Sequence, residues 1–503
     1  METFDYIVVG GGSAGCVLAA RLSANPDTRV LLLEAGPIEP VPDMEDPTLW
    51  WQLLGSSVDW DFETVPQPAL NGAVLRVPQG KVLGGSSGIN GTMFIRGNRS
   101  SFDAWDAGGA TGWNYDALLP YFKRSERAPG RDPAYRGTEG PIDVAPPSTT
   151  GPLWEACFEA AIESGHPFVE DCNAESGEGV SFHENNVLGG KRLSTADAYL
   201  TRVANRENLT VRADAHVRRL LLESTTCRGV EYRVGNELFV AGADRETILA
   251  AGAIPTPTLL LLSGIGPGDH LRSVGVDVKV DLPGVGENFH DHVKSQVAYT
   301  TTVPVHVPEM ARKPHVMLRS DASVEPDLHI LFTDFPVRPR WETVPETGYS
   351  VVFGLLTPAS RGWIRLAGPD PDQPPLVNPN LLADPSDLDR MICGLQVAQE
   401  IGSAEALAPM RGEELFPGPQ IGTDSEYRAY IRSTATSYTH VVGSCKIGTD
   451  AMAVVDPDLK VRGVDNLRIA DASVMPSVPS ANTNPSVIAV AERAADLIIG
   501  GQA

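Results

Sequence analysis

The sequence lacks the features that mark membrane-spanning and nucleic-acid-binding proteins. Its longest apolar stretch, residues 254–262, contains two prolines and is far shorter than the roughly 18 residues that a membrane-spanning helix requires. It also lacks a basic excess, since 64 acidic residues oppose 40 basic ones and give a net charge of −24. Such a surface repels phosphate backbones and anionic lipid headgroups. We therefore expect neither nucleic acid nor a membrane among its partners.

Cysteine is scarce and never paired along the chain. No CxxC motif occurs, and the six cysteines are Cys16, Cys157, Cys172, Cys227, Cys393 and Cys445. This pattern predicts reduced thiols, without a disulfide framework or a zinc site. The first residues, METFDYIVVGGG, carry acidic side chains where a secretory signal would carry basic ones. We expect a cytoplasmic protein with no metal centre.

The order of hydrophobic patterns predicts two kinds of architecture in one chain of 503 residues, long enough for two or three domains. An apolar β run, a glycine turn, a helical pattern and a second β run open the chain, which is a βαβ unit of a parallel sheet. Residues 327–335 and 349–366 are strand-rich with proline-rich connections, which predicts a mostly antiparallel sheet. A strand at 467–470 and a helix at 487–499 match the strand-and-helix pattern of the N-terminal unit.

A glycine pattern follows the first predicted strand. Gly10-Gly-Gly-Ser-Ala-Gly15 matches GxGxxG, in which Gly12 lets the main chain approach a pyrophosphate and Gly15 lets the helix pack on the strand. Glu34, nineteen residues past Gly15 at the end of the next strand, is placed to accept hydrogen bonds from ribose hydroxyls. The pattern predicts an ADP-containing dinucleotide and does not separate FAD from NAD.

Two further glycine-rich segments separate those cofactors. Residues 80–90, GKVLGGSSGIN, resemble the first signature of the glucose–methanol–choline (GMC) family of FAD-dependent oxidoreductases, and residues 252–266, GAIPTPTLLLLSGIG, resemble the second. Shorter similarities occur at 284–292, at 358–362 and in the C-terminal block. The resemblance covers essentially the whole chain, and it is strongest to the branch of bacterial alcohol oxidases and choline dehydrogenases.

The resemblance implies a fold and a cofactor. It implies a Rossmann-like FAD-binding domain (residues 1–150, 190–300 and 430–503) and a discontinuous, mostly antiparallel-sheet substrate-binding domain (151–189 and 301–429). In some relatives a histidine bonds covalently to the flavin, but the matching residue here is Ile89, so non-covalent FAD is expected. The residues implied to contact FAD are Gly10, Gly12, Ser13, Ala14, Gly15, Glu34, Ala35, Gly84, Gly85, Ser86, Asn90, Gly91, Thr92, Met93, Val217, Ala251, Gly252, Asp471, Ala472, Asn484 and Pro485.

The same resemblance implies two catalytic residues near the C-terminus. Family members place a histidine and a second residue, histidine or asparagine, opposite the flavin N5. His440 matches the first, and counting fourteen residues back from Asp496 places the second at Asn482. A register shifted by two residues, with Asn484 as the partner, stays open. His290 and His292 flank an aspartate without further metal ligands nearby, and we interpret them as structural or flavin-side hydrogen bonders.

These residue types suit the oxidation of an alcohol CH–OH group to a carbonyl. A neutral imidazole such as His440 can act as general base for the hydroxyl proton, an amide N–H can bind the developing alkoxide, and the flavin N5 takes the hydride. We expect O2 as electron acceptor, giving H2O2. The alternatives are a choline or alcohol dehydrogenase with another acceptor, and a redox-silent enzyme similar to hydroxynitrile lyases.

The substrate is a small-molecule alcohol that the motifs do not specify. Candidates are a sugar or glycoside hydroxyl, a primary or aromatic alcohol, and a choline-like cation. Relatives often have proline at the position of Val441 and an aromatic residue at the position of Thr439, so this chain departs from them beside the proposed base. The sequence also leaves the oligomeric state open.

Overall fold

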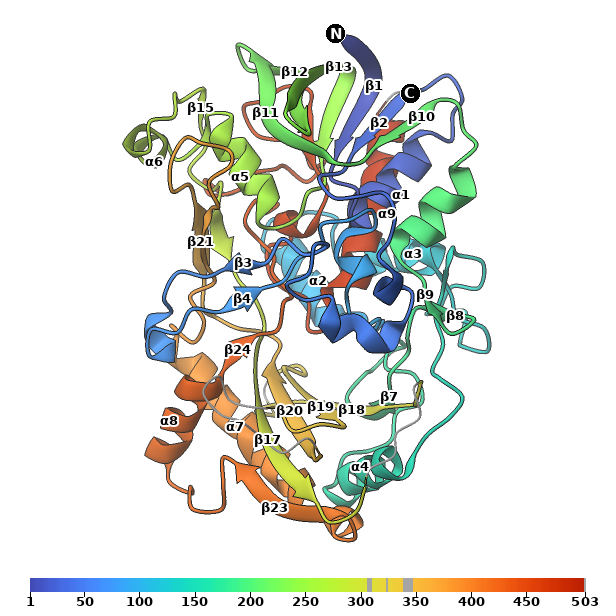
Figure 1. Cartoon of the computed structure of the whole chain (residues 1–503), viewed down its shortest axis with the longest axis vertical. Helices are drawn as coiled ribbons and strands as arrows, with labels where there is room; N and C mark the ends of the chain where they lie inside the picture. The colour runs from blue at the N-terminus through green and yellow to red at the C-terminus, as the bar shows by residue number, and fades with distance from the viewer. Residues whose placement is uncertain (305–309, 323, 338–346, 502–503) are drawn as a thin grey trace.

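Two large sheets, one toward each end of the molecule, dominate the structure (Figure 1). The computed structural model describes residues 1–304, 310–322, 324–337 and 347–501. Residues 305–309 and 338–346 of the expected substrate-binding domain lie outside the described residues.

The first sheet is built around parallel strands from the start, the middle and the C-terminal part of the sequence. Its strands run in the order β10-β2-β1-β13-β12-β11, with β25 beside the end of β13. β1, β2, β10, β13 and β25 pair in parallel, while β11, β12 and β13 form an antiparallel meander. The bounds are β1 (Glu2–Val9), β2 (Val30–Leu33), β10 (Leu209–Arg212), β11 (Ala215–Glu223), β12 (Thr226–Val234), β13 (Glu237–Leu249) and β25 (Leu467–Ile469). All four residues of β2 are buried, as continuous apolar runs are in parallel sheets.

The first and last long helices pack against each other beside this sheet. α1 (Ser13–Leu22) and α9 (Thr483–Gly500) are joined by an ion pair between Arg21 Nη2 and Glu492 Oε1 at 2.7 Å. The Glu492 side chain is fully buried. It also accepts a hydrogen bond from Tyr199 and forms an ion pair with Arg124 of α3 (Tyr115–Ser125). The two ends of the chain therefore form one structural unit.

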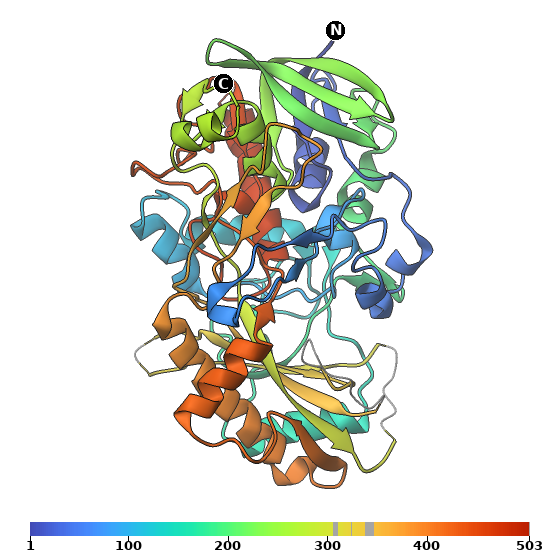
Figure 2. The ribbon, with the colours of Figure 1, turned by 60° about the vertical axis from the view of Figure 1, so that its left-hand side comes forward.

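The second sheet is antiparallel throughout its main path, β23-β17-β20-β19-β18-β7, and β24 pairs with the start of β17. The bounds are β7 (Gly179–Phe182), β17 (Val293–Thr301), β18 (Pro314–Leu318), β19 (Leu328–Thr333), β20 (Tyr349–Leu355), β23 (Arg411–Phe416) and β24 (Thr436–Ser437). α4 (Pro152–Glu163), α7 (Pro385–Ser403) and α8 (Asp424–Thr434) pack on this sheet (Figure 2).

Alternation along β17 shows how the second sheet divides its faces. Val293 and Val297 belong to the apolar core beneath the helices, whereas Lys294 and Gln296, which alternate with them, line a cavity on the other side. The sheet therefore buries one face and offers polar side chains from the other.

The remaining elements connect the two sheets or lie at their edges. They are β3 (Phe62–Glu63), β4 (Arg76–Val77), α2 (Arg99–Ala107), β5 (Glu126–Arg127), β6 (Ile142–Asp143), β8 (Val187–Leu188), β9 (Lys191–Arg192), α5 (Pro255–Leu262), β14 (Ile265–Gly266), α6 (Gly268–Ser273), β15 (Val280–Asp281), β16 (Glu287–Phe289), β21 (Gly362–Arg365) and β22 (Leu376–Asn378), with short 3-10 or π turns between them.

The fold class predicted from the sequence is confirmed: a Rossmann-like sheet is combined with a mostly antiparallel second sheet. The domain boundaries stay a prediction. β17 and β24 belong to the second sheet, although residues 190–300 and 430–503 were assigned to the FAD-binding domain. Among the described residues, no helix combines the length and the apolar character needed to cross a membrane.

Candidate active site

A cavity of about 1230 Å³ lies between the two sheets. Its volume exceeds the roughly 300–1,000 Å³ of pockets that hold drug-sized ligands, so a large cofactor and a substrate can share it. Of the residues implied to contact FAD, all but Gly15, Gly84 and Pro485 line this cavity, and His440 and Asn482 line it as well. The residues predicted from scattered motifs therefore converge on one site.

The Gly10–Gly15 turn and the segment of residues 80–90 touch each other on the cavity wall. Gly10, at a φ of +100°, ends β1 in a left-handed turn, and a Cβ atom on Gly85 would lie only 2.6 Å from the Cα of Gly12. Gly15 does not line the cavity because its role is packing, since a Cβ there would come within 1.8 Å of the Gly10 carbonyl oxygen. Main chain without side chains faces the cavity here, together with the N-terminus of α1, and this arrangement fits a pyrophosphate.

Glu34 is fixed beside this turn. Its Oε2 accepts the Gly11 N–H at 2.7 Å, and its Oε1 accepts the Gly36 N–H at 2.8 Å. Burial raises the pKa of this carboxyl to about 7, against the lowering effect of the backbone hydrogen bonds. Each oxygen keeps a lone pair for a further donor, so the geometry fits the expected contact with ribose hydroxyls.

Arg192, which no sequence motif indicated, holds the loop at Asn90 and Thr92. The Asn90 side-chain oxygen accepts hydrogen bonds from the Thr92 N–H at 3.0 Å and from Arg192 Nη1 at 2.9 Å. Thr92 has a φ of +60°, and these bonds hold it in that conformation. Arg192 lies about a hundred residues away in sequence, and no local pattern marks it. Ile89, at the position where some relatives attach the flavin, is a buried aliphatic residue.

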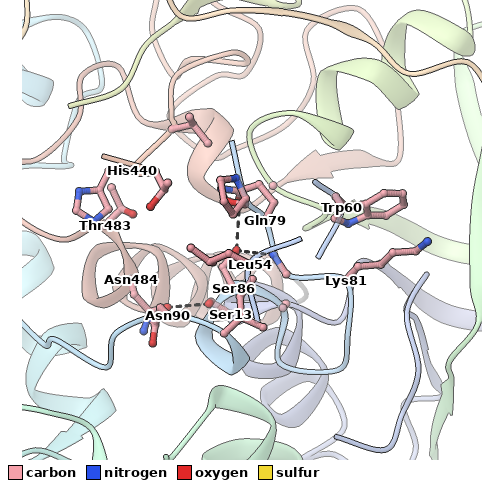
Figure 3. A pocket seen from close by; sticks show the side chains of 18 of the residues that line it. Ser13, Leu54, Trp60, Gln79, Lys81, Ser86, Asn90, His440, Thr483 and Asn484 are labelled. Carbon is pink, nitrogen blue, oxygen red and sulfur yellow. Dashed lines mark hydrogen bonds between the residues drawn. The ribbon is translucent and has the colours of Figure 1, made fainter. Parts of the chain in front are cut away.

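The start of α9 carries both candidate asparagines, and the structure gives them different partners. Ser13 Oγ donates to Asn484 Oδ1 at 2.7 Å, which joins the first turns of α1 and α9 (Figure 3). Asn482 Nδ2 instead lies 3.2 Å from His440 Nε2. Of the two registers that the sequence left open, the structure therefore brings Asn482 beside His440.

The segment before His440 is held in a strained conformation by one buried carboxylate. Thr439, a β-branched residue, has a φ of +66°. Asp291 accepts the Thr439 N–H at 3.2 Å, the His440 N–H at 2.7 Å and the Ser437 hydroxyl. These bonds fix the main chain at His440, and burial raises the pKa of Asp291 to about 6 in spite of them.

The imidazole of His440 is held from three sides. Its Nδ1 lies 3.0 Å from Nδ1 of His292, its Nε2 faces Asn482, and the Tyr438 ring stacks on it with centroids 4.8 Å apart. With the Asn482 amide donating to Nε2, that nitrogen carries no proton and Nδ1–H donates to His292. Burial lowers the pKa of His440 well below its usual value, and charge at His292 or Lys294 lowers it further, so the ring is neutral. The Nε2 lone pair of this neutral imidazole, which accepts from the Asn482 amide here, can accept a proton once the amide turns to another acceptor.

The two histidines of the 290–292 motif have different roles. His290 Nδ1 donates to the Asn288 carbonyl at 2.6 Å, and its Nε2 accepts the Val478 N–H at 2.9 Å, which is a structural arrangement. His292 contacts His440 directly, a partnership that the motif did not indicate. Within the described ranges, no three His, Cys, Asp or Glu side chains cluster as metal ligands.

Comparisons with known proteins show which family the chain belongs to. The family models of the N- and C-terminal parts of GMC oxidoreductases match residues 4–294 and 358–491. The mitochondrial choline dehydrogenase of Mus musculus is 38% identical, with 99% of this chain and 90% of that protein covered. The oxygen-dependent choline dehydrogenase of Sinorhizobium fredii is 36% identical over 99% of this chain and 96% of its own length.

Solved structures show the same likeness in three dimensions. Pyridoxine 4-oxidase from Mesorbium loti has a TM-score of 0.94 at 34% identity, covering 98% of each chain. A formate oxidase has a TM-score of 0.91 at 27% identity, covering 99% of this chain and 98% of its own. The chain therefore belongs to the GMC oxidoreductase family and is an FAD-dependent oxidoreductase that acts on CH–OH donors.

Proposed function

We propose that His440 and Asn482 carry out the oxidation of an alcohol to a carbonyl compound in this chain. The observation that carries the proposal is the neutral His440 imidazole on the cavity wall, with its Nε2 3.2 Å from the Asn482 amide nitrogen. FAD, when bound, supplies the acceptor for the hydride. The protein residues place the hydroxyl, take its proton and exclude water.

The proposed roles follow from the donors and acceptors on each side chain. His440 Nε2 accepts the hydroxyl proton, and the charge that develops on the ring is shared through Nδ1–H with His292. The Asn482 amide, which contacts Nε2 before substrate binds, then donates to the alcohol oxygen as negative charge develops there. The buried Asp291 keeps the main chain at His440 fixed while this happens.

We assign the FAD contacts to residues that line the cavity on the side of the parallel sheet. The Gly10–Gly15 turn and Gly85 would hold the pyrophosphate, and Glu34 the ribose. The loop at Asn90 and the first turn of α9 at Asn484 would face the flavin. Because Ile89 offers no nucleophile, acid or heat should release all FAD into the supernatant, and flavin retained in the protein precipitate would contradict this assignment.

We further propose O2 as the electron acceptor, which takes two electrons and two protons to give H2O2. The names of the similar proteins support this proposal, since pyridoxine 4-oxidase, formate oxidase and oxygen-dependent choline dehydrogenases are among them. The cytoplasm remains the proposed compartment on the evidence of the unpaired cysteines.

Anaerobic mixing with a panel of alcohols tests the function. Loss of flavin colour that yields one carbonyl product per flavin supports oxidation, whereas product formation without any loss of colour would support the lyase alternative. Readmission of air then tests the acceptor. Rapid recovery of colour with one H2O2 per carbonyl supports O2, and recovery only with an added quinone would replace it.

A further inference from the structure

Among the described residues, Lys81, Lys294 and Lys313 line the active-site cavity, and Lys294 is the one whose charge acts on His440. The Lys294 ammonium, on β17, forms no ion pair and no hydrogen bond with any residue in the described part of the chain. Nζ lies over the face of Tyr438, whose ring centroid is 5.0 Å away. Tyr438 stacks in turn on His440, so the unpaired charge lies one aromatic ring away from the proposed base.

Asp291 is the acidic group whose charge acts on Lys294, and its oxygens already accept hydrogen bonds from other groups. It raises the pKa of the ammonium, but burial lowers it more. The Asp291 oxygens accept their hydrogen bonds from Ser437, Thr439 and His440, as described above. The lysine therefore bears the cost of burial without a counter-ion, and such a cost is offset when an anion binds.

A second unsatisfied donor lies on the same face of β17. Gln296 lines the cavity, its side chain is 3% exposed, and its Nε2 has no hydrogen-bond partner among the described residues. Because it is two residues from Lys294 on one strand, the two side chains leave the same face of the sheet. Thr436 of β24 pairs directly with Lys294 and also lines the cavity, which adds a hydroxyl to this group.

The acidic residues of the cavity do not neutralise this group of donors. Those among the described residues are Glu34, Asp61, Glu63, Asp334, Asp372 and Asp471. Glu34 and Asp471 accept backbone N–H groups, and Asp61 and Asp372 pair with arginines. Glu63 is on β3, outside the second sheet.

Asp334 is the acidic residue next to the second sheet, and it lies far along it. His329 is in register with Lys294 through Gly354, and Asp334 follows five residues later. At about 3.3 Å per residue, the Asp334 main chain lies roughly 16 Å along the strand from His329, the residue level with Lys294. It is therefore too remote to pair with the ammonium.

We propose that the alcohol substrate carries an anionic group, such as a carboxylate, that binds to Lys294 and Gln296 while its hydroxyl faces His440. An anion with two oxygens can accept from the ammonium and from the amide at once, and both bonds form in a site shielded from water. The inference rests on the proposed function of His440. It separates this chain from the choline dehydrogenases it resembles, because choline is a cation that Lys294 would repel.

The test uses holoenzyme and three aromatic alcohols of one shape and different charge: para-(hydroxymethyl)benzoate, benzyl alcohol and para-(aminomethyl)benzyl alcohol. The readout is the rate of anaerobic flavin reduction as a function of alcohol concentration. We expect kcat/KM at least tenfold higher for the anion than for the neutral alcohol, and lowest for the cation. Equal values for all three, or a preference for the cation, would overturn the proposal.

Variants of Lys294 test whether this residue causes the preference for an anionic substrate. Lys294→Met should lower the ratio of kcat/KM for the anion to kcat/KM for the neutral alcohol at least tenfold. Lys294→Arg should keep this ratio, and Lys294→Glu should reverse the preference toward the cation. Lys191→Met removes an exposed lysine from the surface and serves as the matched control. FAD content and the thermal unfolding midpoint report whether each variant is folded. An unchanged preference in folded Lys294→Met and Lys294→Glu would contradict the proposal.

A binding measurement keeps this inference separate from the proposed function. Benzoate and benzylamine carry no oxidisable hydroxyl, and their Kd values can be read from changes in the flavin absorbance spectrum. Tighter binding of benzoate than of benzylamine in wild type, lost in Lys294→Met, supports the anion site. If no alcohol reduces the flavin, the proposed function fails while these titrations still decide the charge preference. If flavin reduction works but benzoate binds no better than benzylamine, only the anion site fails.

Discussion

The two walls of the cavity are built from different parts of the polypeptide. The wall at the parallel sheet presents main chain at Gly10, Gly12 and Gly85, with a carboxylate held by backbone N–H groups. The wall at the antiparallel sheet presents side chains, among them His440 and Lys294. A backbone-built wall can recognise a part common to many ligands, whereas a side-chain wall can change its chemistry through single substitutions while the sheet is kept.

Placing a side chain on the backbone-built wall should have the largest effect. A Cβ on Gly12 finds the Gly85 Cα at 3.7 Å as its nearest neighbour, so Gly12→Val is expected to fold, with its methyl groups in the space assigned to the pyrophosphate. We expect purified Gly12→Val to carry almost no FAD, as measured by absorbance and by flavin extraction. Gly422→Val is the control, because nothing lies within 4 Å of a Cβ at that exposed loop position. Wild-type flavin content in Gly12→Val would show that the glycine turn does not hold the cofactor.

Removing the proposed base from the opposite wall should leave the cofactor and remove the chemistry. His440→Ala is expected to retain FAD and to lower the rate of anaerobic flavin reduction about 10²–10⁴-fold, the usual effect of a positioned general base. Stopped-flow absorbance with saturating alcohol measures this rate. A variant that lost its FAD instead would mean that both walls hold the cofactor, and a wild-type rate would refute the role of His440.

Asn482→Ala should have a smaller effect than His440→Ala. The base survives and one hydrogen bond to the developing alkoxide is lost, so we expect a rate lower by roughly 10–10³-fold. Because both residues act on one oxygen, the double variant should lose less than the product of the two single effects. Asn484→Ala is the comparison variant, since its partner is Ser13. If Asn484→Ala with FAD bound slowed flavin reduction more than Asn482→Ala, the catalytic assignment would move to Asn484.

His292 acts on substrate only through His440, so its replacement should cost less again. His292→Phe keeps a ring in the same space and removes the acceptor for Nδ1–H, a neutral hydrogen bond of about 1 kcal/mol. We expect flavin reduction to slow roughly 3–10-fold, with kcat rather than KM affected and with FAD content unchanged. A change in KM alone would indicate that His292 shapes the substrate site instead.

The smallest expected effect is that of mild acid on the wild-type rate. Only the neutral imidazole accepts a proton, and burial together with His292, Lys294 and His329 lowers the pKa of His440 well below 6.5. Asp291, which contacts the main chain at His440, has a raised pKa of about 6. The rate of flavin reduction should therefore stay nearly constant from pH 8 to about 6.5 and fall only under more acidic conditions. A half-maximal rate near pH 6.5 would show that the imidazole titrates as if exposed to water.

The sequence predicted the two walls unequally. The glycine turns, Glu34, His440 and Asn482 were identified because each belongs to a motif with fixed local spacing. Arg192 and Lys294 were not identified as parts of the site, and His292 was interpreted as a structural or flavin-side residue without its contact to His440, because tertiary pairing brings these residues there. Lys294 reaches the cavity only because β17 joins the antiparallel sheet, whereas the sequence placed that segment with the nucleotide-binding part. Side-chain direction on such a strand depends on register, which the motifs do not encode.

The packing of α1 on α9 has a consequence for the biosynthesis of this enzyme. Arg21 and Ser13 are synthesised 471 residues before their partners Glu492 and Asn484, which lie in α9. Until that helix leaves the ribosome, the nucleotide-binding turn lacks the neighbour that completes its wall. Cofactor loading therefore waits until α9 has been synthesised. A truncation before Thr483 would leave the strands of the parallel sheet in the chain and remove the helix that completes this wall.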